Sequence, residues 1–374
     1  MSNQKIYFPN LNGLRFLAAF LVIIHHIEQI KSTFKIDNYW TNSSILIIGK
    51  LGVILFFVLS GFLITYLILA EERLVGEINI KKFYLRRILR IWPLYFLVIL
   101  LAFFVLPYID FLVIPKFGKE VIYSDLLVKL SLFAIIFPNL VLSIFGVVPY
   151  ASHTWSIGTE EQFYCIWPII FRYVKNFRLL LLLFIIFSYL LFGLFLLSHY
   201  SDAIPYKHII RAFFSTFNID CMAIGGIYAL LLFQKSVYLK FLLNTKLFYL
   251  TVILVLIMMF KGFYLQYINF EFYSVLFGII ILNFAANDNI KITLENNILN
   301  YLGSISYGLY MYHPIGIVVA IAISMALNLT TNWIIYPLSF VFTILMAGLS
   351  HKYFESYFLR FKIKFSNIIS GIGI

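Results

Sequence analysis

Residues 45–69 read ILIIGKLGVILFFVLSGFLITYLIL and contain a single charged side chain, Lys50. A helix that crosses a bilayer needs about 20 mostly apolar residues, and this run has that length. Working outward from it, similar apolar runs lie near 10–28, 84–107, 157–173, 178–198, 209–233, 246–262, 271–287, 300–325 and 333–351. The sequence therefore predicts an all-α fold, a polytopic membrane helix bundle with about ten transmembrane helices.

The composition excludes a water-soluble protein. Of the 374 residues, 62% are hydrophobic and 12% are charged, whereas soluble domains have about 45–50% apolar and about 25% charged residues. Ten spans joined by short loops use up this length. We therefore expect one membrane domain, residues 1–374, and no separate soluble domain.

One further apolar segment, 125–147, is interpreted as a re-entrant or interfacial helix, because a full span there would place the basic turn 172–178 outside. With this arrangement, the segments assigned to the cytoplasm hold 18 of the 28 Lys and Arg residues. Cytoplasmic loops carry such an excess, so both termini are predicted to be cytoplasmic. The net charge of +12 thus indicates topology and not nucleic-acid binding.

Ionisable side chains inside a span are costly and mark candidate functional sites. In the first span, Arg15 and His26 are about 16 Å and about three turns apart along a helix, so both could face one interior cavity. Alternatively, Arg15 reaches the headgroups and the pair His25-His26 merely caps the outer end of the helix.

Polar groups also occur in the second and third spans. Ser60-Gly61 interrupts a series of bulky residues; such small residues allow close helix packing, and the gap could also admit part of a substrate. The third span begins with a basic cluster that contains Arg86, Arg87 and Arg90. Arg87 and Arg90 share one helix face, and their guanidinium groups suit phosphate. The cluster either anchors the span or holds a pyrophosphate-bearing donor.

Two later segments carry further candidates. Glu160 lies just inside the fourth run, where burial would require a partner such as His or Arg. In the ninth run, Tyr310 and His313 are three residues apart and could share a helix face. No metal site is indicated, because the histidines lack carboxylate or thiolate partners at ligand spacing; they are His25, His26, His153 and His313.

Taken in order, these segments resemble the acyltransferase-3 family of integral membrane O-acyltransferases. Each piece alone is weakly specific, whereas the ordered set is specific and spans positions 13–314. The pieces are Arg15 and His26 with ten residues between them, Phe56 to Thr65, Arg87-Ile88-Leu89-Arg90, Trp155-Ser156 with Glu160 and Phe163-Tyr164, and Ser306 to Tyr310 with His313. A mild departure is Ile157-Gly158-Thr159, where the family usually has Leu first and then a small residue and Val or Ile.

The resemblance implies transfer of an acyl group, most often acetyl, from cytosolic acyl-coenzyme A (acyl-CoA) to a hydroxyl of a cell-surface polysaccharide or its lipid-linked glycan precursor. It also implies a multi-pass protein of a bacterial inner or plasma membrane. Many members have an additional esterase-like domain, which we do not expect here because the sequence ends shortly after the last predicted span.

The resemblance also suggests roles for individual residues. His26 matches the essential histidine of the family and Arg15 its paired arginine, while Arg87 and Arg90, with the neighbouring Arg86, match the donor-binding region. The remaining matches surround the central site: Ser60, Trp155, Ser156, Tyr310 as substrate-binding candidates, and Glu160 and His313 as catalytic candidates.

Acyl transfer to a hydroxyl needs a base and hydrogen-bond donors for the oxyanion. A neutral histidine suits the first task, and His26 is the preferred base. A covalent acyl-histidine relay is the alternative mechanism.

Two other classes of function stay open: a flippase or permease for a glycan precursor, and a receptor or structural membrane protein. Release of coenzyme A in the presence of a hydroxylated acceptor would separate the enzyme from both.

Overall fold

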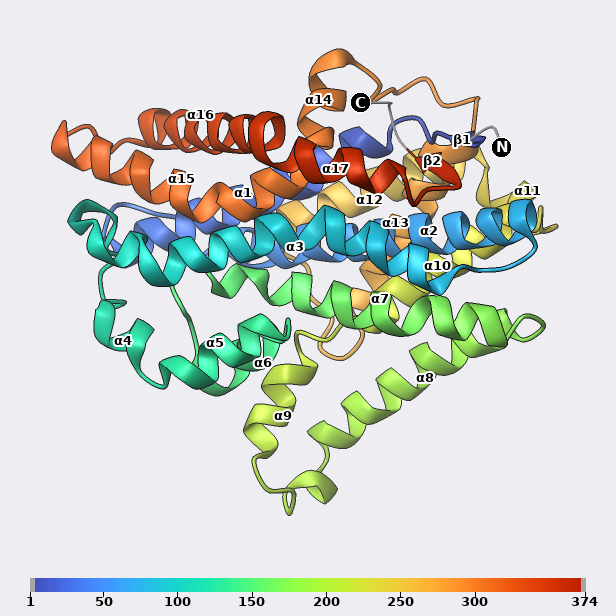
Figure 1. Ribbon diagram of the computed structural model, residues 1–374, viewed down its shortest axis with the longest axis horizontal. Coiled ribbons are helices and arrows are strands. Elements are labelled where there is room, and N and C mark those ends of the chain that lie inside the picture. Colours follow the sequence, from blue (N-terminus) through green and yellow to red (C-terminus); the bar gives the residue numbers. More distant parts are fainter. Residues whose placement is uncertain (1–3, 371–374) are drawn as a thin grey trace.

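The computed structural model describes residues 4–370 as a bundle of helices that run side by side along the long axis of the molecule (Figure 1). Eight helical segments in this range are long and apolar enough to cross a membrane. They are α1 (Leu11–Thr33), α2 (Ser43–Val75), α3 (Ile80–Phe104), α8 (Arg178–Leu197), α9 (Lys207–Phe214) with α10 (Ile219–Phe233), α13 (Asn269–Ala286), α15 (Ser306–Ala326), and α16 (Asn332–Ser350), which continues through a π-helical turn (His351–Glu355) into α17 (Ser356–Ile363).

The two remaining predicted spans also coincide with helices, α7 (Trp155–Tyr173) and α12 (Thr245–Lys261). Helix α7 has 19 residues but carries Glu160, Glu161 and Arg172, so it differs from the eight in composition, whereas α12 has 17 residues and is slightly shorter than they are. The prediction of an all-α membrane bundle is confirmed. The shorter helices are α4 (Lys119–Tyr123), α5 (Leu126–Ala134), α6 (Pro138–Phe145), α11 (Leu239–Leu242) and α14 (Asn297–Ser304), and 3-10 turns occur at Leu106–Tyr108, Asp110–Leu112, Ser152–Thr154 and His199–Ser201.

Segment 125–147 does not form one span. Helices α5 and α6 have 9 and 8 residues, and each is therefore shorter than about 14 Å, well below the thickness of a bilayer core. The break has a local cause, because Pro138 disfavours helical backbone at Phe137, where φ is −116° and ψ is 48°. Proline is well tolerated in the first turn of the helix that follows.

Two of the predicted runs contain breaks. Residues 215–218 separate α9 from α10, and Ile305 separates α14 from α15. The spans predicted near 209–233 and 300–325 are both present, and each run contains one short break in the helix. The second break follows Gly303-Ser304, and glycine and serine are weaker helix formers than the apolar residues around them.

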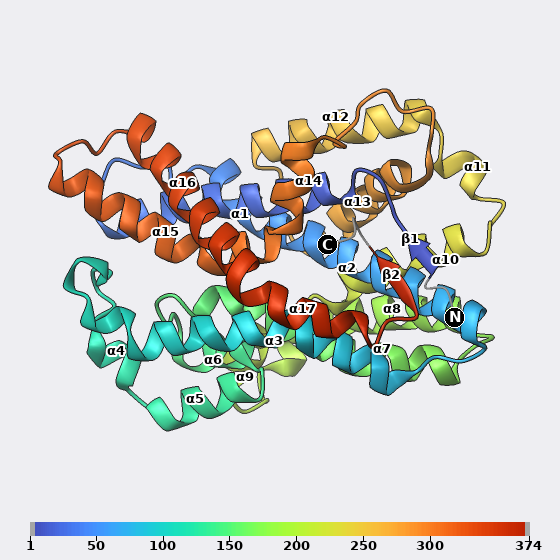
Figure 2. The ribbon, with the colours of Figure 1, turned by 45° about the horizontal axis from the view of Figure 1, so that its top comes forward.

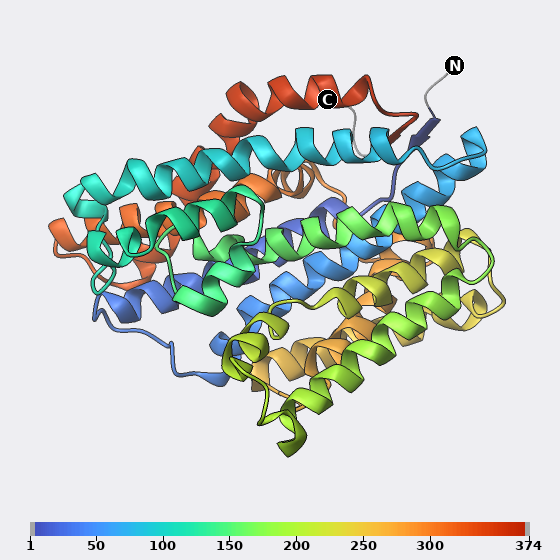
Figure 3. The same ribbon diagram turned by 60° about the horizontal axis from the view of Figure 1, so that its bottom comes forward.

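The two ends of the described chain meet at one end of the bundle. Strand β1 (Gln4–Ile6) pairs in parallel with β2 (Ile368–Ser370), and the pair lies beside the loop between α2 and α3 (Figure 3). The turn 172–178 is tied to the same loop, because Arg172 donates a hydrogen bond to the carbonyl of Ile78 at 3.0 Å. Four segments predicted to be cytoplasmic, the two terminal ones, the loop between α2 and α3 and the turn 172–178, thus share one end, and their cytoplasmic location stays a prediction.

Helix α2 is the central element, because 72% of an apolar 18-residue stretch of it is buried inside the protein. In α8, at the margin of the bundle, the corresponding share is 11% (Figure 1). Close packing of α2 on α10 depends on glycine. A Cβ atom at Gly61 would lie 2.0 Å from the carbonyl oxygen of Met222, and one at Gly225 would lie 2.2 Å from that of Val58. The Ser60-Gly61 step therefore permits close helix packing, as the sequence suggested.

Candidate active site

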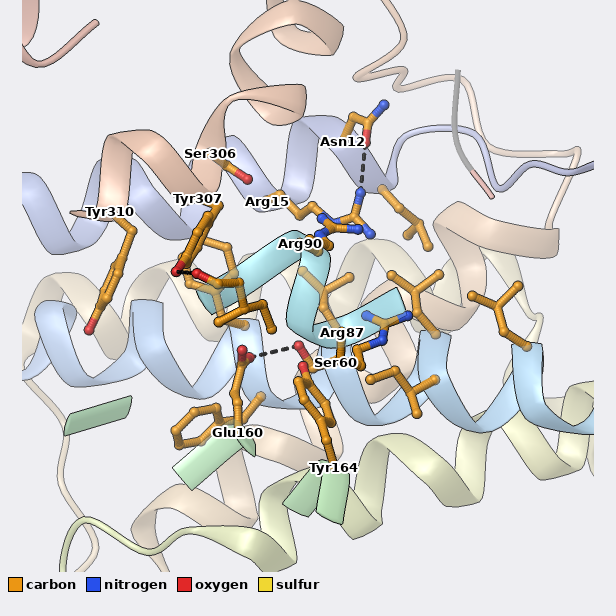
Figure 4. A pocket seen from close by; sticks show the side chains of 18 of the residues that line it. Asn12, Arg15, Ser60, Arg87, Arg90, Glu160, Tyr164, Ser306, Tyr307 and Tyr310 are labelled. Carbon is orange, nitrogen blue, oxygen red and sulfur yellow. Dashed lines mark hydrogen bonds between the residues drawn. The ribbon is translucent and has the colours of Figure 1, made fainter. Parts of the chain in front are cut away.

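A cavity of about 150 Å³ opens between α1, α2, α3, α7 and α15, and residues of the β1 strand and the segment after it border it (Figure 4). Its wall combines apolar side chains with a small group of polar ones. The polar lining residues are Tyr7, Asn12, Arg15, Ser60, Arg87, Arg90, Ser156, Glu160, Tyr164, Ser306, Tyr307 and Tyr310. Such a mostly apolar cavity with a few converging polar groups is typical of a small-molecule site.

Three arginines from two helices face this cavity. Arg15 lies near the start of α1 and donates a hydrogen bond to Asn12 Oδ1 at 2.9 Å, while Arg87 and Arg90 share one face of α3. None of the three forms an ion pair within the part of the chain that the structure describes. The Nε atom of Arg87 is buried without a hydrogen-bond partner. This excess of positive charge favours an anionic ligand.

Arg86 differs from its neighbours. Its guanidinium group binds both oxygens of Glu71, at 3.2 Å and 2.7 Å, and it does not line the cavity. The structure therefore brings together two of the three arginines predicted to bind the donor. Arg86 borders a smaller hollow beside them, which Arg87 shares.

Glu160 supplies the carboxylate of the cavity wall. Ser60 donates a hydrogen bond to Glu160 Oε1 at 2.8 Å, which links α2 to α7. The next carboxylate, Glu161, points elsewhere and accepts a hydrogen bond from Trp92 Nε1 at 2.8 Å. With three arginines and one lining carboxylate, the cavity keeps a net positive charge.

Tyr310 and Ser156 form another polar part of the cavity wall. The Tyr310 hydroxyl donates to the carbonyl of His153 at 2.5 Å, and because it has only one proton, it accepts the hydrogen bond from Ser156 Oγ at 2.7 Å. Trp155 does not line the cavity; its ring packs edge-on against Phe57 at a centroid distance of 6.2 Å.

A cluster of three histidines lies beyond Tyr310. The His313 ring is 4.7 Å from that of His26 and 5.1 Å from that of His153, between ring centroids. None of the three lines the cavity, so the expectation that Arg15 and His26 face the same cavity is wrong. About 16 Å along α1 separates the two residues, which places them at different depths.

Backbone contacts determine which nitrogen of each ring is free. His26 Nδ1 lies 2.9 Å from the carbonyl of Val22, and His313 Nδ1 lies 2.6 Å from that of Tyr310. A carbonyl only accepts, so each Nδ1 carries a proton, and the lone pair of the neutral ring is on Nε2. Pro314 explains the second contact, because proline lacks the N–H that would otherwise bond to the Tyr310 carbonyl.

His25 has a different environment from His26. Its Nδ1 lies 2.8 Å from the carbonyl of Ile45, and its ring lies 4.9 Å from that of Trp40 in the loop between α1 and α2. Among residues 4–370, no three His, Cys, Asp or Glu side chains are arranged to hold a metal ion.

Sequence reasoning missed several residues at the mouth of the cavity. Asn12 could have been found, because it precedes Arg15 by three residues and so shares its helix face. Tyr7 gave no such signal; its hydroxyl donates to Glu295, far away in sequence. Although burial alone raises the pKa of Glu295, hydrogen bonds from Tyr7, the Asn10 amide and Asn300 hold it below its usual range. These bonds fix the N-terminal segment over the cavity.

Comparison with known proteins places the chain in a family. The sequence model of a family described as an acyltransferase domain matches residues 8–351. The peptidoglycan O-acetyltransferase OatA of Listeria monocytogenes is 31% identical over 183 residues, which cover 48% of this chain and 27% of that protein. The O-acetyltransferase OatA of Staphylococcus aureus is 27% identical over 368 residues, which cover 94% of this chain and 57% of that protein.

The chain thus spans less than two thirds of the length of these relatives. No solved structure matches it. Because the family match covers nearly all of the helical bundle, the protein belongs to the acyltransferase-3 family.

Proposed function

We propose that the protein is a membrane O-acetyltransferase that moves an acetyl group from cytosolic acetyl-CoA to a hydroxyl of a cell-surface glycan, in the cell membrane. The observation that carries the proposal is the cavity with three arginines, which form no ion pair among residues 4–370, beside the histidine cluster. The printed names of the two relatives support acetyl as the group and peptidoglycan as the acceptor class. A single membrane domain without a resident metal remains part of this proposal.

The arginine cavity suits the donor. Coenzyme A carries phosphate groups, and charge-assisted hydrogen bonds from guanidinium groups are among the strongest contacts to phosphate. A cavity of about 150 Å³ is comparable to one that holds a benzene molecule. It therefore admits a small acyl group such as acetyl more readily than a long acyl chain.

The histidine cluster suits the chemistry. In the proposed reaction, Nε2 of His26 takes the proton of the acceptor hydroxyl as its oxygen attacks the carbonyl carbon of the thioester. The carbon–sulfur bond breaks, and the released thiolate takes up a proton. Arg15 positions the donor or offsets the developing negative charge. Glu160 accepts the hydrogen bond from Ser60 and so keeps these two polar side chains of the cavity wall in place.

A relay through the histidine is the alternative route. There Nε2 attacks the thioester carbonyl, the carbon–sulfur bond breaks, and the released thiolate takes up a proton. The acyl-histidine then passes the acyl group to the hydroxyl oxygen, which loses its proton to solvent, and the neutral histidine is restored. This route suits a donor and an acceptor on opposite sides of the membrane, because the cluster lies deeper than the arginines. His313 shares the same free nitrogen and lies next to His26, so it is the second candidate for either role.

The proposal is tested with the purified protein in lipid vesicles, supplied with acetyl-CoA on one side and soluble peptidoglycan fragments on the other. We expect release of the free thiol of coenzyme A in step with formation of an alkali-labile ester on the glycan. Movement of glycan across the bilayer without thiol release would instead support a flippase or permease and would contradict the proposal.

A further inference from the structure

A second, smaller hollow of about 30 Å³ lies directly beside the arginine cavity and shares Ile64, Leu67 and Arg87 with it. Its other polar lining residues are Glu71 and Arg86 from the α2 and α3 helices, and Lys362 and Ser366 from α17 and the segment that follows. Helix α17 packs across α3 at this point (Figure 2). The volume admits one small group only.

The charges around this hollow do not balance. The charge of Glu71 is already paired, because its carboxylate accepts two hydrogen bonds from Arg86 and one from Asn367 Nδ2 at 2.9 Å. That leaves Arg87 and Lys362, neither of which forms an ion pair among residues 4–370.

Lys362 adds to an already positive region. It lies within electrostatic range of the arginines at positions 15, 86, 87 and 90. Like charges held together in a half-buried place repel one another unless a counter-anion is bound. Phosphate is such an anion, and an ammonium group beside a guanidinium group suits its several oxygens.

We propose that this hollow binds a phosphate group of the donor, with Lys362 and Arg87 as its ligands. The proposal rests on the proposed function, because it places the acyl end of acyl-CoA in the large cavity. The phosphates lie at the other end of the coenzyme A arm and would therefore emerge at the mouth. The strand pair borders both spaces: Ile6 of β1 lines the cavity and Ile368 of β2 lines the hollow.

Replacement of the lysine tests the assignment. K362Q should raise the KM for acetyl-CoA by about tenfold or more, because one charge-assisted hydrogen bond to the phosphate is lost. The kcat should stay nearly unchanged. With S-acetylpantetheine, which lacks every phosphate, K362Q and the wild type should behave alike. K364Q is the matched control, because Lys364 is exposed and does not line the hollow; it should match the wild type with both donors.

Several results would overturn this proposal. One is an unchanged KM of K362Q for acetyl-CoA, which is also the result expected if a lipid headgroup phosphate fills the hollow. Another is an equal loss with both donors, which would indicate a structural role for Lys362. Failure of the wild type to use any acetyl thioester would instead refute the proposed function.

A second measurement uses the wild-type protein and does not depend on how the variant folds. Coenzyme A should protect Lys362, but not Lys364, from an amine-reactive reagent, as read by mass spectrometry, and pantetheine should protect neither. Equal labelling of Lys362 with and without coenzyme A would contradict the proposal.

Discussion

The hydroxyl of Tyr310 lies 2.7 Å from Oγ of Ser156, and this contact stands where the arginine-lined cavity meets the histidine cluster. Both residues line the cavity, and the Tyr310 ring lies 5.7 Å from that of His313 and 5.6 Å from that of His153. Tyr310 is therefore placed to affect the passage of an acyl group between the two regions.

Replacing Tyr310 with Phe should lower acetyl transfer by about 10-fold to 100-fold, because a buried polar partner is lost at a cost of about 1–3 kcal/mol. Donor binding should stay near normal, since the arginines are untouched. S156A should have a smaller effect, and the double variant should lose less than the two single losses combined. Strictly additive losses would show that the contact does not act as a unit.

Arg87→Ala and Arg90→Ala should each weaken acetyl-CoA binding by about 10-fold to 100-fold, the range for a hydrogen bond to a charged group. Arg→Lys at either position should also be impaired, because the planar fork is lost. Equilibrium binding to protein in detergent measures this effect. R360A is a suitable control, because Arg360 is exposed on α17 and lines neither space. Normal affinity in the double variant R87A/R90A would refute the assignment.

Removal of one partner from the buried ion pair at the end of α1 should be strongly destabilising. Lys31 Nζ lies 2.7 Å from Glu28 Oε1, and both side chains are 0% exposed. Lys31→Met leaves the Glu28 charge buried and should cost about 3–5 kcal/mol. The control is Asp202→Asn, which changes the pair with Lys207 where Asp202 is 63% exposed and should have a much smaller effect, because solvent screens an exposed ion pair. Equal losses in thermal unfolding midpoint would contradict this prediction.

Topology can be tested with single cysteines introduced at positions 80 and 240, predicted to be cytoplasmic, and at 37 and 328, predicted to be outside. The exposed Cys165 is first replaced by Ser. In sealed cells, an impermeant thiol reagent should label positions 37 and 328 only. Labelling of position 80 or 240 from outside would contradict the predicted topology.

The sequence predicted the helices and much of the cavity wall, because these depend on local patterns. Arg15, Arg87, Arg90 and Glu160 do converge, each from a helix whose apolar run could be recognised. The contact of His26 with His313, away from the cavity wall, could not be derived, since it depends on how α1 and α15 pack. Lys362 was missed for a similar reason: nothing near it in sequence indicates that α17 crosses α3.

The position of the N-terminal segment could not be predicted from local sequence patterns either. Tyr7 is held by Glu295, and β1 pairs with β2 at the other end of the described chain. Both contacts join residues separated by most of the sequence. The hydrophobic periodicity of single helices and strands does not indicate which distant residues will meet. The i, i+3 spacing of Glu28 and Lys31, in contrast, was visible in the sequence and could have indicated the buried ion pair.

The most direct test of the account compares acetyl transfer to a glycan hydroxyl by H26A, H313A and H25A, at matched amounts of inserted protein. If His26 Nε2 is the base, H26A should lose about 10²-fold to 10⁴-fold in transfer while it still binds acetyl-CoA. H25A should have a mild effect, because Nδ1 of His25 lies against the Ile45 carbonyl and its ring packs on Trp40 as well as on His26. Appreciable transfer by H26A, with a severe loss in H313A, would contradict the assignment of His26 as the base.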